Sequence, residues 1–142
     1  MSFARDQYSA TGSQTDFTIT FPYLSTDHIE VTQNGSTLTV TTHYSFPNAT
    51  TMRLVTGATL ADVIVITRNT SQSTILVDFT AGTLVEADLD RNALQMFYMA
   101  QEAVDDAALS LRLGTDGNWD ATSFQIKNVL DPTLAQDAAT LA

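Results

Sequence analysis

Few side chains in this sequence have the types and spacing that catalysis or metal binding requires. The two histidines, His28 and His43, lie in segments with strand-like alternation, and neither a serine elbow nor an H-E-x-x-H pattern accompanies them. A histidine in such a segment is more often a surface or hydrogen-bonded structural residue than a catalytic base. The sequence therefore predicts no catalytic residue, no bound metal and no cofactor.

Acidic residues occur in close pairs, and a pair of carboxylates is what glycoside hydrolysis uses. Asp88 and Asp90 are two residues apart, and Asp105 and Asp106 are adjacent, in a segment whose periodicity predicts a helix. Side chains at these spacings point in different directions from a helix, so they do not face one substrate bond. Helix capping and solvation explain both pairs better.

A third candidate is a calcium loop. Asp116, Asn118 and Asp120 have the spacing of the first three ligands of such a loop. The pattern then fails, because Ala121 stands where glycine is needed and Lys127 stands where a bidentate glutamate is needed. An ordinary turn is the better interpretation.

Composition excludes further classes of function. The 142 residues include 16 acidic and 6 basic side chains, for a net charge of -10, and such a surface repels nucleic acid and acidic membranes. The chain has no cysteine, which excludes disulfides and thiol catalysis. No apolar run is long enough to span a bilayer, and the first residues lack the pattern of a signal peptide. We therefore expect synthesis and folding in a cytoplasm.

The first half of the chain predicts strands and turns. Phe17, Ile19 and Phe21 alternate with threonines, as in a half-buried strand, up to Pro22. The segments 29–33 and 37–41 flank Asn34-Gly35, the strongest short signal for a hairpin.

Further strands are predicted at 52–55, which Gly57 closes, at 62–68 and at 74–79. Four consecutive β-branched residues, 63–66, predict a strand that is buried on both faces. The regular spacing of strands and turns predicts an antiparallel β-sandwich or small barrel.

From about residue 85 to 112 the period becomes helical. Apolar residues recur at steps of three and four: Leu89, Ala93, Met96, Phe97, Ala100, Ala103, Val104, Ala107 and Leu111. The opposite face is polar and includes Gln95, Gln101, Glu102 and Asp105. Two interpretations stay open: the apolar stripe packs on the protein's own sheet, above all between Leu89 and Ala100, or its alanine-rich end contacts copies of the same helix around a threefold axis.

Residues 115–142 predict a turn, a short strand at 124–129 and a segment too polar to form a core alone. The predicted fold is thus mainly β with one long helix, followed by a short β segment at the C-terminus. The predicted regions are a β domain (1–83), a long helix (84–113) and a trimerising junction (114–142).

Residues 75–106 resemble the tail-fibre N-terminal domain of short-tailed bacteriophages of the T-seven type. The family pattern runs from a strand with V-D-F-x-x-G through a leucine-rich helix entry to a helix ending near E-A-x-D. The residues that match it are Val77, Asp78, Phe79, Gly82, Leu84, Asp88, Leu89, Glu102, Ala103 and Asp105. The segment 116–140 also resembles the junction that leads into the shaft of many phage fibres.

The resemblance implies a structural protein of the virion tail, not an enzyme. It implies a homotrimer that docks on tail adaptor and nozzle proteins and takes part in host attachment. This chain ends where relatives continue into a shaft, so it is either part of a longer fibre or an adaptor for a separate fibre or spike. The trimer interface is predicted to comprise Met96, Ala100, Ala103, Ala107, Leu111, Trp119, Phe124, Ile126 and Val129.

Two alternatives compete with this interpretation. A carbohydrate-binding module needs exposed aromatic side chains, and Trp119, Tyr23 and Tyr44 are the candidates. A small depolymerase needs an acid/base pair, which the sequence does not offer.

Overall fold

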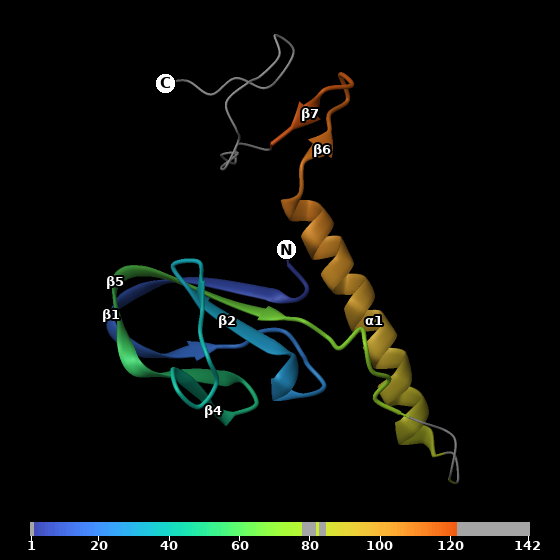
Figure 1. Ribbon diagram of the computed structural model, residues 1–142, viewed down its shortest axis with the longest axis horizontal. Coiled ribbons are helices and arrows are strands. Elements are labelled where there is room, and N and C mark those ends of the chain that lie inside the picture. Colours follow the sequence, from blue (N-terminus) through green and yellow to red (C-terminus); the bar gives the residue numbers. More distant parts are fainter. Residues whose placement is uncertain (1, 78–81, 83–84, 122–142) are drawn as a thin grey trace. The chain divides into compact units, whose positions relative to one another are not determined.

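The structure of the protein is a computed structural model that describes residues 2–77, 82 and 85–121. The chain divides into two compact units, Met1–Asp106 and Ala107–Ala142. Its elements, labelled in Figure 1, are β1 (Arg5–Thr18), the 3-10 helix η1 (Thr26–His28), β2 (Ile29–Gln33), β3 (Ser36–Thr37), β4 (Tyr44–Asn48), β5 (Thr51–Arg68), α1 (Glu86–Leu109), β6 (Arg112–Leu113) and β7 (Trp119–Asp120).

The described strands of the first unit form one antiparallel sheet. Its order is β1–β5–β2–β3, and β4 also pairs with β5. The prediction of a mainly antiparallel β fold with one long helix and a short β segment near the C-terminus is confirmed. The sheet does not close on itself, so it is not a barrel.

The long strands β1 and β5 form a two-stranded ribbon that folds back on itself. The carboxylate of Asp6, near the start of β1, accepts hydrogen bonds from the backbone N–H and hydroxyl of Thr20 at 2.8 and 2.6 Å. The rings of Tyr8 and Phe17 lie 5.6 Å apart, although both residues belong to β1. The two halves of the ribbon therefore face one another, as Figure 1 shows.

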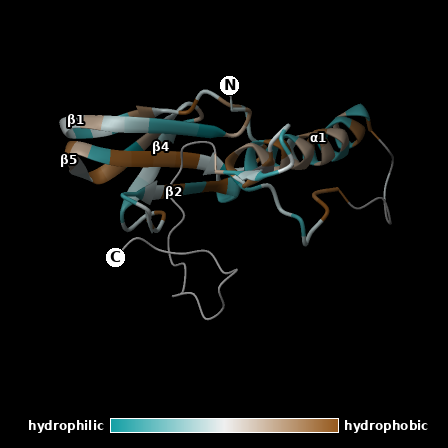
Figure 2. Ribbon diagram, turned by 90° about the horizontal axis from the view of Figure 1, so that it is seen from above, coloured by the Kyte–Doolittle hydropathy of each residue, from teal (hydrophilic) through white to brown (hydrophobic). Residues whose placement is uncertain are grey.

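The hydrophobic core lies between these two halves. Its largest fully buried apolar side chains come from β1, β2 and both halves of β5: Phe17, Val31, Met52, Ile64 and Ile66. Hydrophobic residues accordingly run along β5 within the sheet, whereas α1 carries hydrophobic and hydrophilic residues along its length (Figure 2).

A bend in the ribbon makes this fold possible. Gly12, Ser13 and Ala61 have positive φ angles of 90°, 52° and 69°, and the pairing of β1 with β5 shifts register on either side of Gly12. A Cβ atom on Gly57 would lie 3.0 Å from the backbone carbon and oxygen of Ser13. The strands thus approach each other at the bend more closely than a side chain at position 57 would readily allow.

The predicted Asn34-Gly35 hairpin is confirmed. Both residues have positive φ, 52° and 82°, as a type I′ turn requires, and β2 pairs with β3 on either side of them. The carboxylate of Asp62 on β5 accepts hydrogen bonds from the side chains of Gln33 and Asn34, each at 2.7 Å, and from the backbone of Thr59 at 2.8 Å. These bonds fasten the hairpin tip to β5.

These donors hold the pKa of Asp62 well below its ordinary value, with the Asn34 side chain the largest cause. A depressed pKa means that the carboxylate's contribution to stability is fully present above the unfolded-state pKa of about 3.9 and is lost as pH falls toward the folded-state value.

Asp62→Asn should therefore lower the thermal unfolding midpoint at neutral pH and flatten its decline below about pH 4. Unfolding midpoints between about pH 2 and 7 test this expectation, with Asp27→Asn on η1 as the matched control. A variant curve that parallels that of the unaltered protein throughout this range would contradict it.

Three details of the predicted strands are wrong. The segments 52–55 and 62–68 belong to one strand, because Gly57 lies at the bend and does not end the strand. This strand buries Ile64 and Ile66 but leaves Val63 36% exposed, so it is buried on one face and not on both. Residues 74–77 are not a strand, and 78–79 lie outside the described residues.

Two other predicted boundaries also differ. The strand predicted at 37–41 is limited to Ser36–Thr37. The predicted helix 85–112 is confirmed as Glu86–Leu109, with acidic residues in its first turn. The predicted strand at 124–129 lies outside the described residues.

Candidate assembly interface

Helix α1 turns its polar side toward the sheet. The described helix residues that are buried are Gln95, Tyr98 and Glu102, which follow one another at steps of three and four. The interpretation in which the apolar stripe from Leu89 to Ala100 packs on the protein's own sheet is therefore wrong. The sheet presents a charged group to α1, and that group needs a polar partner.

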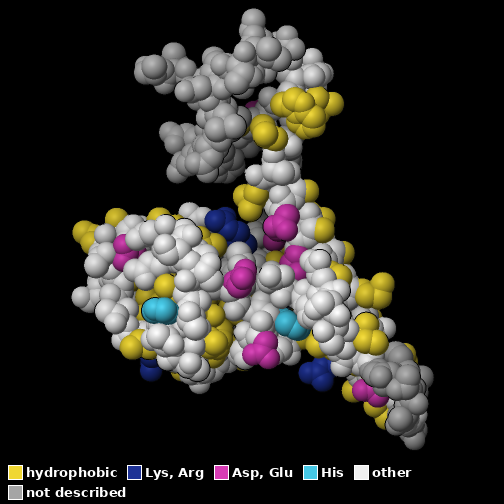
Figure 3. Space-filling model, viewed as in Figure 1, with side chains coloured by type: hydrophobic (Ala, Val, Ile, Leu, Met, Phe, Trp, Pro, Cys, Tyr) yellow, Lys and Arg dark blue, Asp and Glu magenta, His cyan; other side chains and the backbone are white. Residues whose placement is uncertain are grey.

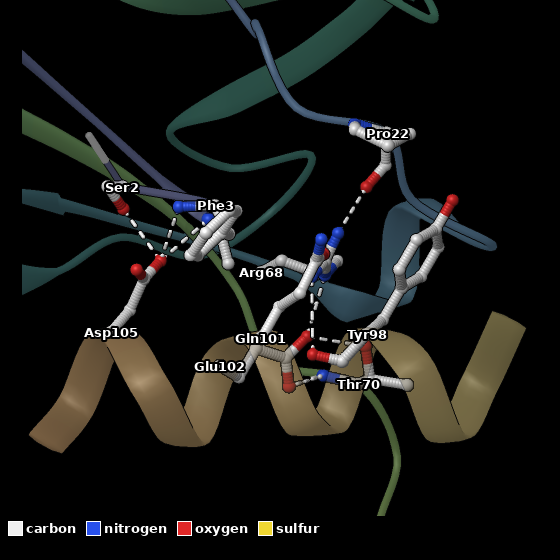
Figure 4. A network of polar contacts seen from close by, with 10 residues as sticks. Ser2, Phe3, Pro22, Arg68, Thr70, Tyr98, Gln101, Glu102 and Asp105 are labelled. Atoms are coloured by element: carbon white, nitrogen blue, oxygen red, sulfur yellow. Dashed lines mark hydrogen bonds and ion pairs between the residues drawn. The ribbon is translucent and has the colours of Figure 1, made fainter.

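This charged group is the guanidinium of Arg68, at the end of β5. Its Nε lies 2.7 Å from Oε1 of Glu102, and its side chain is fully buried. The carboxylate of Glu102 also accepts hydrogen bonds from the backbone and hydroxyl of Thr70, at 2.9 and 2.6 Å. Figure 4 shows this network between the strand end and the helix.

The remaining donors of Arg68 are also used. Nη1 donates to the carbonyl of Pro22 at 2.7 Å, and Nη2 donates to the side chain of Gln101 at 2.9 Å. The guanidinium carbon lies 4.0 Å from the centre of the Tyr98 ring, within cation–π range. A buried charge with this many partners is stable only while the partners stay in place.

Two further polar contacts extend the joint along the helix. Oδ2 of Asp105 accepts hydrogen bonds from the Ser2 hydroxyl and the backbone N–H groups of Phe3 and Ala4, at 2.7 to 2.8 Å (Figure 4). Gln95 donates to the carbonyls of residues 71 and 74 and accepts from the N–H of residue 76. We call the polar contacts made by Arg68, Gln95, Glu102 and Asp105 the polar joint.

The sequence carries a signal for this joint. Arg68 follows Ile64 and Ile66 at steps of two, which places its side chain on the buried face of the strand. A buried arginine requires a carboxylate partner, and Glu102 is the acidic residue that follows Gln95 and Tyr98 on one side of the helix.

The other side of α1 exposes apolar side chains. Met96 is 68% exposed, Phe97 and Val104 are each 56% exposed, and Leu89 is 50% exposed. Ala100, Ala103 and Ala107 are exposed on the same side. We call this surface the outer face of α1; hydrophobic side chains along the helix are visible in Figure 3. On this face the side chains of Leu89, Met96, Phe97 and Val104 are at least half exposed in the described part of the single chain.

The predicted interface residues divide into three groups. Met96, Ala100, Ala103 and Ala107 lie together on the outer face. Leu111 is exposed but lies beyond the end of α1, so its predicted place on the helix is wrong. Trp119 belongs to the second unit, as Ala107 and Leu111 also do, and the predicted members Phe124, Ile126 and Val129 lie outside the described residues.

In the second unit, β6 and β7 form a short hairpin. Leu113 pairs with Trp119 across it, and the two side chains are 62% and 72% exposed. The carboxylate of Asp116 accepts bonds from the backbone and side chain of Asn118, which lowers the pKa of Asp116. These contacts are those of an ordinary turn, as predicted.

The described residues show no catalytic or metal-binding site that would compete with the outer face of α1 as the functional site. His28 is buried, and His43 accepts a hydrogen bond from the backbone of Thr39. Over the same part of the chain, no cluster of three or more metal-ligating side chains occurs, and no helix is long and apolar enough to cross a membrane.

Of the three aromatic residues that a carbohydrate-binding surface would require, one is well exposed. Tyr44 is buried in the core, and Tyr23 packs against the core and donates to the carbonyl of Ala49. Of these three residues, Trp119 is the exposed one, at 72%.

Known proteins resemble this chain over most of its length. The tail fibre protein of Escherichia phage T7 is 35% identical over 92% of this chain, and "Depolymerase, capsule KN4-specific" of Klebsiella phage KN4-1 is 35% identical over 89%. An anchor protein of Klebsiella phage KP34 is 28% identical over 99%. This chain spans only 25%, 15% and 44% of these three relatives, respectively.

Residues 1–121 also match the family described as "Phage T7 tail fibre protein, N-terminal domain". The match covers the sheet, the polar joint and the hairpin, which are the parts of the chain that the structure describes. The chain therefore belongs to the family of T7-type phage tail fibre N-terminal domains.

Proposed function

We propose that this chain is a structural module of the virion tail, which anchors a fibre or spike to the phage tail for host attachment. One observation carries the proposal. Nearly the same length of chain recurs in a tail fibre, a capsule depolymerase and an anchor protein, whose remaining parts make up more than half of each. A region shared by proteins with such different names serves what they have in common, which is attachment to a tail.

By the same reasoning, we assign the enzymatic activity of the depolymerases to the parts of those relatives that this chain does not match. The name depolymerase applies to a relative as a whole, and this chain spans only 15% of the length of the relative from Klebsiella phage KN4-1. Glycoside hydrolysis uses two carboxylates set around the scissile bond. Asp116 and Asp120 line one pocket of the described residues, but the carboxylate of Asp116 is engaged by the backbone and side chain of Asn118, as in an ordinary turn. In our proposal the chain is a mechanical part and not an enzyme.

The proposed assembly is a homotrimer built around the outer face of α1. The polar joint occupies the other side of the helix, so the apolar side remains available to copies of the chain. Alanines at 100, 103 and 107 permit close approach of helices. The hairpin that carries Trp119 has strands too short to be stable alone, and contacts between subunits would support it.

The proposed partners differ at the two ends of the assembly. On one side the trimer docks on adaptor and nozzle proteins of the tail. On the other side it continues into a fibre or receives a separate fibre or spike. The acidic composition suits protein partners better than nucleic acid or membrane.

Binding to tail particles tests the proposed function. Purified chain should co-sediment with phage particles assembled without their fibres, saturate at a fixed number of copies per particle, and be displaced by excess unlabelled chain. Particles that already carry fibres are the control and should bind little. Absence of saturable binding to fibreless particles, together with binding to purified capsule polysaccharide, would contradict the proposal and favour the carbohydrate-binding alternative.

A further inference from the structure

We infer that the bend of the β1–β5 ribbon is the surface that docks on the tail, and that its partner is an uncharged, apolar surface of a tail protein. This inference rests on the proposed function and adds to it a specific contact. We call the surface the bend surface, and it comprises residues 7–15 of β1 and 54–61 of β5.

The bend surface is free of charge. Neither stretch contains Asp, Glu, Lys or Arg, although the chain carries 22 such residues. The charged residues that flank it already have partners: Asp16 pairs with Arg53 at 2.6 Å, Asp62 is bonded to the hairpin tip, and Asp6 is bonded to Thr20. The centres of protein interfaces are depleted of charged residues in the same way.

The same surface exposes large apolar side chains. Leu60 is 75% exposed and Val55 is 65% exposed, while their neighbours Leu54 and Ala58 are buried in the core. Leu60 pairs with Thr11 across the ribbon and lies 3.7 Å from the position a Cβ of Gly12 would occupy. An exposed leucine on a rigid, charge-free strand can insert into a pocket of a partner.

The conformation of the bend supports a binding role. Ala61 has a φ of 69°, a left-handed conformation that is unfavourable for an alanine. Residues held in such conformations cluster at functional sites, where the surrounding structure fixes them. The bonds from Thr59, Gln33 and Asn34 to Asp62 hold the adjoining strand in place.

The position of the bend also suits docking on a tail. Figures 1 and 2 both place it at the end of the sheet remote from α1, and Figure 3 shows hydrophobic side chains at that end. Within the first unit, the chain passes from the sheet to α1 at the end of β5 that carries Arg68. We expect the contact with the tail to lie away from the point where the chain passes from the sheet to α1, and the bend surface meets this condition.

The test compares charge substitutions in the fibreless-particle assay. Val55→Glu with Leu60→Glu should raise the dissociation constant for particles about thirtyfold or more, because a carboxylate would be buried in an apolar pocket. Leu60→Gln, which adds no charge, should weaken binding less. The control is Ile75→Glu, because Ile75 is 66% exposed and lies beside α1; it should bind normally.

The outcomes separate this inference from the proposed function. Circular dichroism and the sedimentation mass of each variant should match those of the unaltered chain. If the Val55/Leu60 variant binds particles normally, or if Ile75→Glu weakens binding as much, the assignment of the bend surface is wrong while the anchoring function stands. If the unaltered chain fails to bind, the proposed function fails, and this inference fails with it.

Discussion

Glu102→Ala should lower the free energy of unfolding by about 3–5 kcal/mol, the loss expected when one partner of a buried ion pair is removed. The substitution leaves the fully buried guanidinium of Arg68 without its carboxylate. It also removes the acceptor for the backbone and hydroxyl of Thr70. Urea denaturation at one fixed protein concentration measures the effect, because oligomerisation makes apparent stability depend on concentration.

Two further variants give this prediction its control. Asp106→Ala removes an exposed carboxylate from the same helix and should change stability by no more than about 0.5 kcal/mol. Replacing both Arg68 and Glu102 by methionine should recover much of the loss, because no unpaired charge is then buried. Equal stability of Glu102→Ala and Asp106→Ala would show that the polar joint does not hold α1 to the sheet.

Ala103→Glu combined with Ala107→Glu should abolish the trimer and give monomer or aggregate. In the proposed assembly each helix would bring two carboxylates into an apolar contact, where burial of an unpaired charge costs several kcal/mol. Both residues are exposed in the single chain, so the substitutions leave the polar joint intact. Sedimentation velocity of the double variant beside the unaltered chain measures the result.

The matched control is Ala87→Glu. Ala87 is exposed in the first turn of α1 and lies about 160° around the helix from Ala103, at 100° per residue. A glutamate there also suits the positive end of the helix dipole, so this variant should remain trimeric. A double variant at 103 and 107 that sediments as the unaltered trimer would place the interface elsewhere.

Local signals in the sequence predicted the features that depend on local conformation. The Asn34-Gly35 turn needs two residues with positive φ, and few residue pairs adopt it so readily. The helix from 86 to 109 follows from an unbroken period with acidic residues in its first turn. The family resemblance likewise rests on residues within one continuous stretch of the chain, 75–106.

Features that depend on distant residues were not predictable in the same way. Gly57 looked like the end of a strand, but it permits the close approach of Ser13 at the bend. The apolar stripe of the helix favours packing on the sheet, because burial of apolar surface is the usual reason for packing. In the structure the polar side of the helix faces the sheet instead. The buried guanidinium of Arg68 forms hydrogen bonds with Glu102 and Gln101, which leucine or methionine could not provide.

The outer face of α1 is the observation on which the proposed assembly depends, and the mass of the unaltered protein in solution tests it most directly. The chain has a mass of 15.4 kDa, so sedimentation equilibrium should return three times that value, about 46 kDa, at micromolar concentration. A stable, monodisperse species of 15.4 kDa would contradict the account, because α1 would then expose Met96, Phe97 and Val104 to water without a partner.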